Sequence, residues 1–304
     1  MLTVEHVGKE LSGKLILHDI NLGFTQGVYG LLAPNGAGKT TLIKLLATLL
    51  APDAGTIRWN GEDVAAMGER YRGIIGYLPQ DFGYYPNQSP RRFLKYIATL
   101  QGVPRAEIAS RVDELLAMVH LEDQADKRMR TLSGGMIRRV GIVQALIHRP
   151  RILLLDEPTS GLDPKERVRF RNIVHNLADD HIVIIATHIV SDLETIAGRI
   201  VMLGGATVTC NDEPAAVCER LEGHIYEVPE GFVLHDGQLL LSEIQRGGAT
   251  AKRIYSPDPI GGRHPFPEAS ESAAASPEAA SVREGAVVPV PPSLEDAFLL
   301  AYRD

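Results

Sequence analysis

A glycine-bearing run, Ala33-Pro34-Asn35-Gly36-Ala37-Gly38-Lys39-Thr40-Thr41, has the residue types of a phosphate-binding loop. Glycines let the backbone curl so that successive N–H groups point at phosphate oxygens, and the N-terminus of a following helix adds its positive end. Lys39 would bridge the β- and γ-phosphates of a nucleotide, and the Thr40 hydroxyl would bind Mg²⁺. Ala33 stands where the general pattern has glycine. A glycine turn that only opens a core helix is the alternative, and the position of Gly38-Lys39-Thr40 favours phosphate binding.

A second run, Ile152-Leu153-Leu154-Leu155-Asp156-Glu157-Pro158, is an apolar stretch that ends in two adjacent carboxylates. Two charges at the end of a buried strand are costly unless they have a task. Asp156 is placed to bind Mg²⁺, directly or through water, and Glu157 is placed to polarise an attacking water. A helix cap explains the pair about as well when it is taken alone. Together with the phosphate loop, however, the pair predicts a nucleotide-hydrolysing site.

The third run is Leu132-Ser133-Gly134-Gly135-Met136. It is typical of a helix start, with Ser133 as the N-cap and the glycines in a tight turn. The segment alone does not decide between this local role and a functional one.

An α/β core is predicted around these runs. Val28–Ala33 is a short apolar run typical of a strand buried on both faces, and it leads into the glycine-bearing loop. Strand patterns at Ile152–Leu155 and Ile182–Ala186 flank a helical stretch at Pro164–Leu177. A strand, a helix and a strand at this spacing predict a parallel sheet.

Two further regions flank this core. Short β-branched runs from Leu2 to about Leu22 favour an antiparallel edge sheet. Asn60-Gly61 between two strand patterns predicts a hairpin turn. Helix formers and amphipathic stretches predict a helical subdomain at about 88–149.

The composition limits the class of protein. Apolar residues make up 44% and charged residues 23%, so collagen, coiled coil and wholesale disorder are excluded. The net charge of −7 argues against a nucleic-acid partner, which would need a basic face. Two cysteines cannot build a disulfide framework. No run approaches the ~18 apolar residues needed to cross a bilayer, and we expect a cytoplasmic protein.

In chain order, these runs and several further residues resemble the nucleotide-binding subunit of an ABC transporter. The landmarks are Ala33–Thr41, Gln80, Leu132–Met136, Asp156-Glu157, Ser160-Gly161-Leu162-Asp163 and His188. The resemblance covers roughly residues 1–215. It implies an α/β fold, a P-loop NTPase core of the ABC-ATPase type with an antiparallel β subdomain and a helical subdomain. It also implies ATP and Mg²⁺ as ligands.

The resemblance assigns roles to several residues. Gln80 would contact Mg²⁺ or the attacking water and link to the membrane partner, although a solvated loop glutamine is the alternative. Ser133-Gly134-Gly135 would meet the γ-phosphate held by a second subunit, with Asp163 at the seam of the dimer. His188 follows an apolar strand, where a histidine is usually structural. In the family this histidine contacts the γ-phosphate and orients the water, beside Glu157 as the general base.

One set of motifs per chain implies a homodimer, and a separately encoded integral-membrane permease would form the channel. The ATPase would then lie peripherally at the inner face of the membrane. Gly27–Ala33, Thr187–Asp192 and Pro292–Phe298 resemble prokaryotic exporter ATPases of the ABC-2 type, which implies export. The alternative is a soluble ABC ATPase that acts on ribosomes or DNA. Such members usually carry two motif sets or a long coiled coil, and this sequence has one set and no sustained heptads.

The composition changes near residue 228. We expect an ABC ATPase domain over 1–228 and a C-terminal extension over 229–304. Within the extension, a Pro/Ala/Ser-rich linker at about 247–291 is predicted to be disordered. A short terminal helix is predicted at 293–302, capped by Ser293.

One residue departs from the family pattern. The family usually stacks adenine on an aromatic residue near the end of the first strand, and Leu11 stands at that place. An apolar side chain can pack on a purine face, but aromatic stacking worth roughly 1–3 kcal/mol would be absent. We therefore expect weak discrimination between purine bases.

Overall fold

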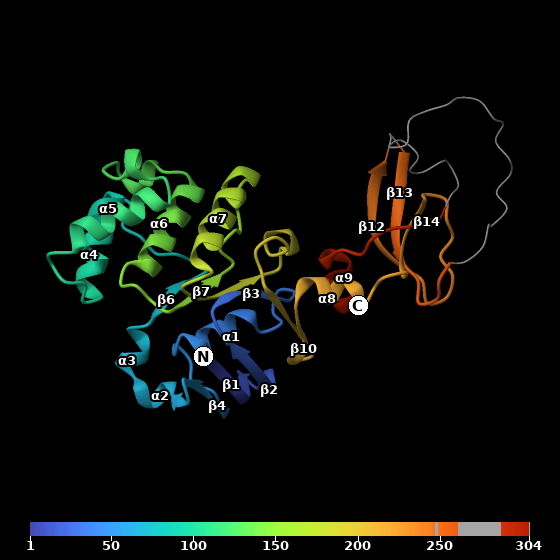
Figure 1. Cartoon of the computed structure of the whole chain (residues 1–304), viewed down its shortest axis with the longest axis horizontal. Coiled ribbons are helices and arrows are strands. Elements are labelled where there is room, and N and C mark those ends of the chain that lie inside the picture. Colours follow the sequence, from blue (N-terminus) through green and yellow to red (C-terminus); the bar gives the residue numbers. More distant parts are fainter. Residues whose placement is uncertain (247–248, 261–286, 304) are drawn as a thin grey trace. The chain divides into compact units, whose positions relative to one another are not determined.

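The structure is a computed structural model that describes residues 1–246, 249–260 and 287–303. The chain forms two compact units, Met1–Pro214 and Ala215–Asp304 (Figure 1). None of the helices in these described segments is both long and apolar enough to cross a membrane.

The core of the first unit is a six-stranded sheet in the order β10-β9-β3-β8-β7-β6. Its strands are β3 (Gly27–Leu32), β6 (Ile75–Leu78), β7 (Ile152–Asp156), β8 (Ile182–Thr187), β9 (Arg199–Gly204) and β10 (Thr207–Asp212). All pairings are parallel except that of β9 with β10. The central strands are buried on both faces, as the continuous apolar runs predicted.

The register of the parallel strands brings four segments to one edge of this sheet. Leu32 at the end of β3 pairs with Thr187 at the end of β8, and Asp156 at the end of β7 pairs with Ala186. Leu78 at the end of β6 pairs with Leu155. Ligands of parallel α/β sheets bind beyond the carboxyl ends of the strands. The loops that follow β3, β6, β7 and β8 are therefore the place to look for a site.

A second, antiparallel sheet in the order β2-β1-β4-β5 confirms the edge sheet expected at the N-terminus. Its strands are β1 (Leu2–Leu11), β2 (Lys14–Phe24), β4 (Ala54–Trp59) and β5 (Glu62–Asp63). The hairpin between β4 and β5 turns at Asn60 and Gly61, whose φ angles are 50° and 86°. Both lie in the left-handed region that a two-residue hairpin turn requires.

The helices of the first unit are α1 (Lys39–Leu46), α2 (Val64–Met67), α3 (Glu69–Arg72), α4 (Pro90–Leu100), α5 (Ile108–Met118), α6 (Gly134–Leu146) and α7 (Pro164–Leu177). Three of them, α4, α5 and α6, come between β6 and β7 in the chain, and Figure 1 shows these three next to one another. Short 3₁₀ turns are η1 (Glu122–Gln124), η2 (Met129–Thr131) and η3 (Val190–Asp192). α4, α5 and α6 pack together through their apolar faces, where a helical region was predicted.

The second unit contains a four-stranded antiparallel sheet in the order β12-β13-β11-β14. Its elements are α8 (Pro214–Glu219), β11 (Ile225–Pro229), β12 (Leu239–Arg246), β13 (Ala249–Tyr255), β14 (Val288–Pro289) and α9 (Leu294–Ala301). Tyr226, Val228 and Ile254 form its buried core, with Phe232 and Leu240 packed against them. Ser293 caps α9 in a capping box with Asp296.

Two expectations about this unit are wrong. The boundary expected at residue 228 falls inside β11, which pairs with β13 and β14 and therefore belongs to the second unit. The linker expected to be disordered from 247 contains β13, because Ala251 and Ile254 lie in the core of the sheet. Residues 261–286 of that linker lie outside the described residues.

A buried charged cluster joins the strands of the second unit to its helix. Arg253 on β13 donates to both carboxylate oxygens of Asp296 on α9, at 2.7 and 2.6 Å. The backbone N–H of Ser293 donates to the same carboxylate at 2.7 Å. Burial opposes ionisation of Asp296, but hydrogen bonds from Arg253 and Ser293 outweigh it, so the pKa of Asp296 is lowered from 3.8. Glu227 on β11 lies 3.6 Å from the same guanidinium.

Candidate functional site

The glycine-bearing loop connects the end of β3 to the start of α1. Gly36 and Gly38 have φ angles of 82° and 105°, which L side chains rarely adopt. A Cβ on Gly38 would lie 2.9 Å from the Leu17 side chain and 3.2 Å from the Ile16 carbonyl oxygen, so glycine is required there. Ala33 has no positive φ, and alanine is therefore accommodated where the general pattern has glycine. The loop presents the N-terminus of α1 and exposes Asn35 and Gly36.

Lys39 is the buried charge of this loop. Its Nζ donates to the carbonyl oxygens of Ala33 at 2.6 Å and Pro34 at 3.2 Å. It also lies 3.5 Å from Oε1 of Glu157. Lys39 and Glu157 are 5% and 4% exposed. Burial lowers the pKa of Lys39, and the neighbouring Glu157 and Asp156 oppose that shift.

Thr40 and Asp156 meet across the gap between α1 and β7. The Thr40 hydroxyl donates to Oδ1 of Asp156 at 3.1 Å. Oδ2 of Asp156 is buried and finds no hydrogen-bond partner among the described residues. Burial raises the pKa of Asp156 from 3.8, although the hydrogen bond from Thr40 opposes the shift. An under-coordinated carboxylate oxygen beside a hydroxyl is a donor set that Mg²⁺ accepts.

Glu157 occupies a strained backbone position directly after β7. Its φ is 46°, in the left-handed region that non-glycine residues seldom occupy. Its N–H donates to the Ala186 carbonyl of β8 at 2.8 Å, which fixes the peptide against the sheet. Nδ1 of His188 lies 3.0 and 3.1 Å from the two carboxylate oxygens of Glu157. The structure therefore brings together Lys39, Thr40, Asp156, Glu157 and His188, which were singled out from the sequence.

Ser133 and Asp163 do not join these five residues and, in the described part of the chain, their side chains form hydrogen bonds only within their own helices. Ser133 caps α6 by accepting a hydrogen bond from the Met136 N–H at 3.2 Å. Asp163 caps α7 by accepting from the Glu166 N–H at 2.9 Å. Within one chain Ser133 therefore has the capping role that its sequence context also allowed, and Asp163 has a capping role that was not predicted. A Cβ on Gly135 would lie 2.7 Å from Cγ of Glu166, so this glycine permits α6 and α7 to pack closely.

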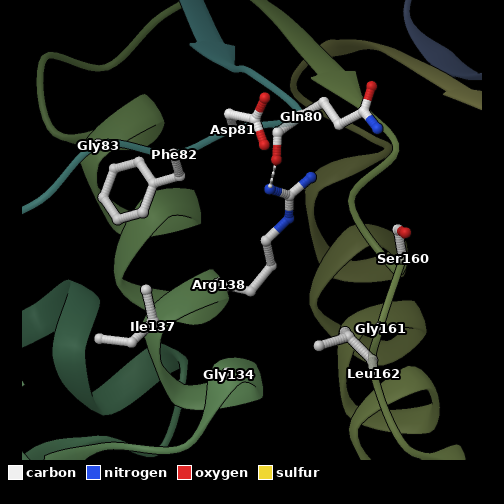
Figure 2. Close-up of a pocket in the computed structure, with 10 residues that line it drawn as sticks. All are labelled: Gln80, Asp81, Phe82, Gly83, Gly134, Ile137, Arg138, Ser160, Gly161 and Leu162. Atoms are coloured by element: carbon white, nitrogen blue, oxygen red, sulfur yellow. Dashed lines mark hydrogen bonds between the residues drawn. The ribbon is translucent and has the colours of Figure 1, made fainter. Parts of the chain in front are cut away.

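Gln80, Gly134 and the segment Ser160–Leu162 line one pocket of about 390 Å³ (Figure 2). Of the residues that the structure describes, none from the 33–41 loop lines it. The main-chain carbonyl of Gln80 points to the guanidinium of Arg138, and the Gln80 side-chain amide is directed away from it (Figure 2).

Arg138 is a site residue that sequence reasoning missed. It lies on α6, is 9% exposed, and donates to main-chain carbonyls of the segments that follow β6 and β7. The signal that could have found it is a charged residue at a buried helical position, five residues after Ser133. Leu11, in contrast, ends β1 beside the hairpin turn and is 37% exposed.

A glycine-bearing loop before a helix, a buried lysine at its base and a strand that ends in two carboxylates define a P-loop nucleoside triphosphatase. The chain matches the ABC transporter family over residues 17–160. It is 31% identical over 283 residues to the uncharacterized ABC transporter ATP-binding protein YxlF of Bacillus subtilis (strain 168), covering 84% of this chain and 94% of that one.

Two further comparisons agree with this assignment. The Nod factor export ATP-binding protein I of Burkholderia orbicola (strain AU 1054) is 35% identical over 216 residues, 70% of this chain and 71% of that protein. A solved structure described as the ATP-binding subunit of an ABC transporter is similar with a TM-score of 0.65 and 26% identity, covering 72% and 92% of the two chains. The chain belongs to the ABC transporter ATP-binding proteins; it binds ATP and is an ATPase.

Proposed function

We propose that this ATPase drives export through a separate membrane permease, with two copies of the chain enclosing ATP between them. The observation that carries the proposal is the division of the motif residues within one chain. Lys39 and His188 both contact Glu157, and Asp156 contacts Thr40, the residue after Lys39. The Ser133 side chain, in contrast, bonds only to its own helix among the described residues. A second copy would supply the missing phosphate contact.

In this proposal the two carboxylates have different tasks. Lys39 binds the β- and γ-phosphates, since its buried ammonium group already lies among oxygen acceptors at the loop. Glu157 is the general base that takes the proton of the attacking water. His188, whose ring lies against Glu157, contacts the γ-phosphate and holds that water in line.

The site fits a magnesium ion. Thr40 and Asp156 would hold it, because Oδ2 of Asp156 is buried without a partner among the described residues. Burial, and to a smaller extent the charge of Glu157, raises the pKa of this carboxyl, and a bound cation would offset both effects. Gln80 is the third candidate ligand. Mg²⁺ usually binds through one or two protein groups plus the substrate phosphates, and when bound it neutralises phosphate charge.

In this proposal, the γ-phosphate of the ATP bound to one copy contacts the second copy at the surface around Ser133. Gly134 lines an open pocket next to the Ser160–Leu162 segment, and Asp163 follows that segment directly. We place Ser133-Gly134-Gly135 against the γ-phosphate of the partner copy and Asp163 at the seam. A helix N-terminus with free amides is suited to bind a phosphate.

Export is supported by the relative named for Nod factor export, which is similar over 70% of this chain. The ATPase would work from the cytoplasmic face of the membrane, bound to its permease. Affinity purification of the tagged protein from cells tests this arrangement. We expect an integral membrane protein to co-purify with it in mild detergent. Recovery of ribosomes or DNA instead would favour the alternative class of soluble ABC ATPases.

The substitution Glu157→Gln tests the shared site. It keeps the shape of the side chain and removes the proton acceptor, so ATP turnover should fall about 10²–10⁴-fold. Mg-ATP binding should survive because Lys39, Thr40 and Asp156 are unchanged. The variant should accumulate as an ATP-dependent dimer, measured by size-exclusion chromatography with light scattering. Adding Ser133→Arg should place bulk and charge at the seam and return the variant to the monomer.

If the ATP-loaded Glu157→Gln protein is monomeric in isolation, the measurement is repeated with the permease present. A protein that is still monomeric there would contradict the dimer mechanism. Turnover at the native rate would show instead that Glu157 is not the base. The two results separate the assembly from the chemistry.

A further inference from the structure

All five N–H donors of the Arg138 guanidinium group are used within the first unit. Nε donates to the Pro158 carbonyl at 3.0 Å. Nη1 donates to the carbonyls of Pro79 at 3.0 Å and Gln80 at 2.8 Å. Nη2 donates to those of Asp156 at 2.7 Å and Glu157 at 2.6 Å. The five acceptors are main-chain oxygens from two segments, one after β6 and one at the end of β7.

The position of this charge is costly. Arg138 is 9% exposed, and burial lowers its pKa, while the carboxylates of Asp156, Glu157 and Asp81 oppose the shift. Arginine nevertheless keeps its charge in proteins. A buried charge is destabilising by several kcal/mol unless hydrogen bonds and opposite charges offset the loss of water. If Arg138 served only to fill space, an apolar side chain of similar size would do so without the cost of burying a charge. The arrangement therefore indicates a further role for Arg138.

The strained peptide of Glu157 shows what that role is. A left-handed φ of 46° is an unfavourable conformation for a glutamate and persists only where neighbours hold it. On one side, the N–H of Glu157 donates to Ala186 of β8. On the other side, its carbonyl accepts from Arg138 in the shortest of the five hydrogen bonds. The direction of the Glu157 carboxylate therefore depends on Arg138 as well as on the sheet.

The same guanidinium reaches the loop that carries Gln80. Figure 2 shows Arg138 extending from α6 to the Gln80 carbonyl, in the pocket that Gly134 also lines. Arg138 and Ser133 belong to one helix segment, since Ser133 is the N-cap of α6. One side chain thus joins the first part of α6 to both segments that carry the proposed water-handling groups.

We propose that Arg138 is a positioning residue for ATP hydrolysis. It holds the main chain of Gln80 and Glu157 in a fixed relative position, so that both side chains are oriented toward the attacking water. The proposal rests on the roles proposed above for these two residues. Arg138 touches neither phosphate nor water in this scheme. Its loss should therefore lower the rate of the chemical step and leave the binding of ATP nearly intact.

The test compares Arg138→Met with Arg111→Met in the full chain. Arg111 also donates to main-chain carbonyls, those of Leu146 and Ile147, but it does so at the opposite end of α6. For Arg138→Met we expect kcat to fall about 10–100-fold, because a shift of about 1 Å in a catalytic group has an effect of that size. The Kd for Mg-ATP, measured by isothermal titration calorimetry, should change by less than about threefold. Arg111→Met should leave both quantities near the native values.

Arg138→Lys is the conservative variant. Lysine keeps the charge and three donors but not the planar fork, so its kcat should lie between those of Arg138→Met and the native protein at the same Kd. If Arg138→Met does not fold, as shown by circular dichroism, Arg138→Lys alone decides. A lowered kcat at native Kd then supports the proposal, and a native kcat overturns it.

Two results would overturn the proposal. One is a folded Arg138→Met protein with native kcat, and the other is a parallel loss of kcat and ATP affinity, which would show a general distortion of the site. Glu157→Gln measured in the same assay separates this inference from the proposed function. If Glu157→Gln loses turnover and Arg138→Met does not, only the positioning role fails. If Glu157→Gln keeps native turnover, the assigned base is wrong.

Discussion

Two aspartates, one in each unit, are almost equally buried, but their pKa values are shifted in opposite directions. Asp156 at the end of β7 is 1% exposed, and burial raises its pKa. Asp296 on α9 is 2% exposed, and its pKa is lowered because hydrogen bonds from Arg253 and Ser293 outweigh burial. The difference lies in the partners, because both oxygens of Asp296 are bonded whereas Oδ2 of Asp156 finds no partner among the described residues.

The comparison separates a structural charge from a functional one. In the second unit the chain supplies the counter-charge itself, and the cluster stabilises the packing of α9 on the sheet. In the first unit the carboxylate remains short of a partner, although Lys39 is close enough to influence it. A charge that the fold leaves under-bonded is stabilised only when something from outside arrives. In our proposal that is the magnesium ion of the ATP site.

Of the substitutions that test this difference between the two aspartates, Asp156→Asn should have the largest effect, which is on ATP turnover. Loss of a metal-binding carboxylate removes several kcal/mol of charge stabilisation, so ATP turnover should fall about 1000-fold. The pKa of Asp156 is raised by folding, so the folded protein binds the proton more tightly than the unfolded one, and ionised Asp156 is destabilising above about pH 3.8. The variant should therefore melt at a higher temperature than the native protein when no nucleotide is added. A lower melting temperature by differential scanning calorimetry would contradict this account.

Asp296→Asn should have the opposite signature. It leaves the half-buried Arg253 without a full charge partner in Asp296, and we expect the second unit to lose about 3 kcal/mol of stability. ATP hydrolysis by the first unit should stay near the native rate. Hydrogen exchange measures the effect, since amides of β11 and β13 such as those of Val228 and Ile254 should lose protection. Unchanged protection would show that the cluster is not what holds this sheet.

The pH dependence is the control for that variant. The pKa of Asp296 is lowered in the folded state, so its contribution is present above about pH 3.8 and is lost as the pH falls through the folded value. The difference in stability between the native protein and Asp296→Asn should therefore be constant near neutral pH and shrink in acid. A difference that grows in acid would reverse the sign we assign.

The smallest effect concerns the base of the nucleotide. Lys39, Asp156 and Glu157 face the phosphates in our proposal, whereas Leu11, more than a third exposed, stands where the family usually has an aromatic residue for the base. Affinity for GTP and ATP should then differ by less than about fivefold, since the stacking contribution is absent. Competition of GTP against a fluorescent ATP analogue measures it. A strong preference for ATP that is lost on mutation of another aromatic residue would show that the adenine contact lies elsewhere.

Most of the first unit was predictable because its signals are local. A buried strand, a glycine-bearing loop and a helix follow one another without interruption at 28–46, so short-range pattern alone places Lys39 and Thr40. The carboxyl-edge location of Asp156 and His188 follows from the rule for parallel strands. The position of Arg138 on a buried helix face was a signal in the sequence, but its role was not, because its five acceptors are main-chain oxygens that carry no sequence signature.

The second unit was less predictable for a related reason. Its core strand β11 pairs with β13 and with β14, and β14 follows it by about sixty residues in the chain. The glycines at 247 and 248 and the prolines beyond 256 are typical of a linker. They hid a strand in which Ala251 and Ile254 are buried. Composition averages over a window, whereas a strand of seven residues is defined by which side of the sheet each residue faces.

The ion pair between Arg253 and Asp296 has a consequence for folding during synthesis. The two residues are 43 positions apart, and β14 and α9 both come from the later part of that interval or beyond it. During synthesis the strands β11, β12 and β13 leave the ribosome before their last partners exist. The guanidinium of Arg253 must then stay hydrated until α9 emerges, and the open edge of β11 must wait for β14. Since domains fold as units while the chain is made, and unpaired edges are prone to aggregate, we expect this sheet to need protection on the ribosome until α9 has emerged.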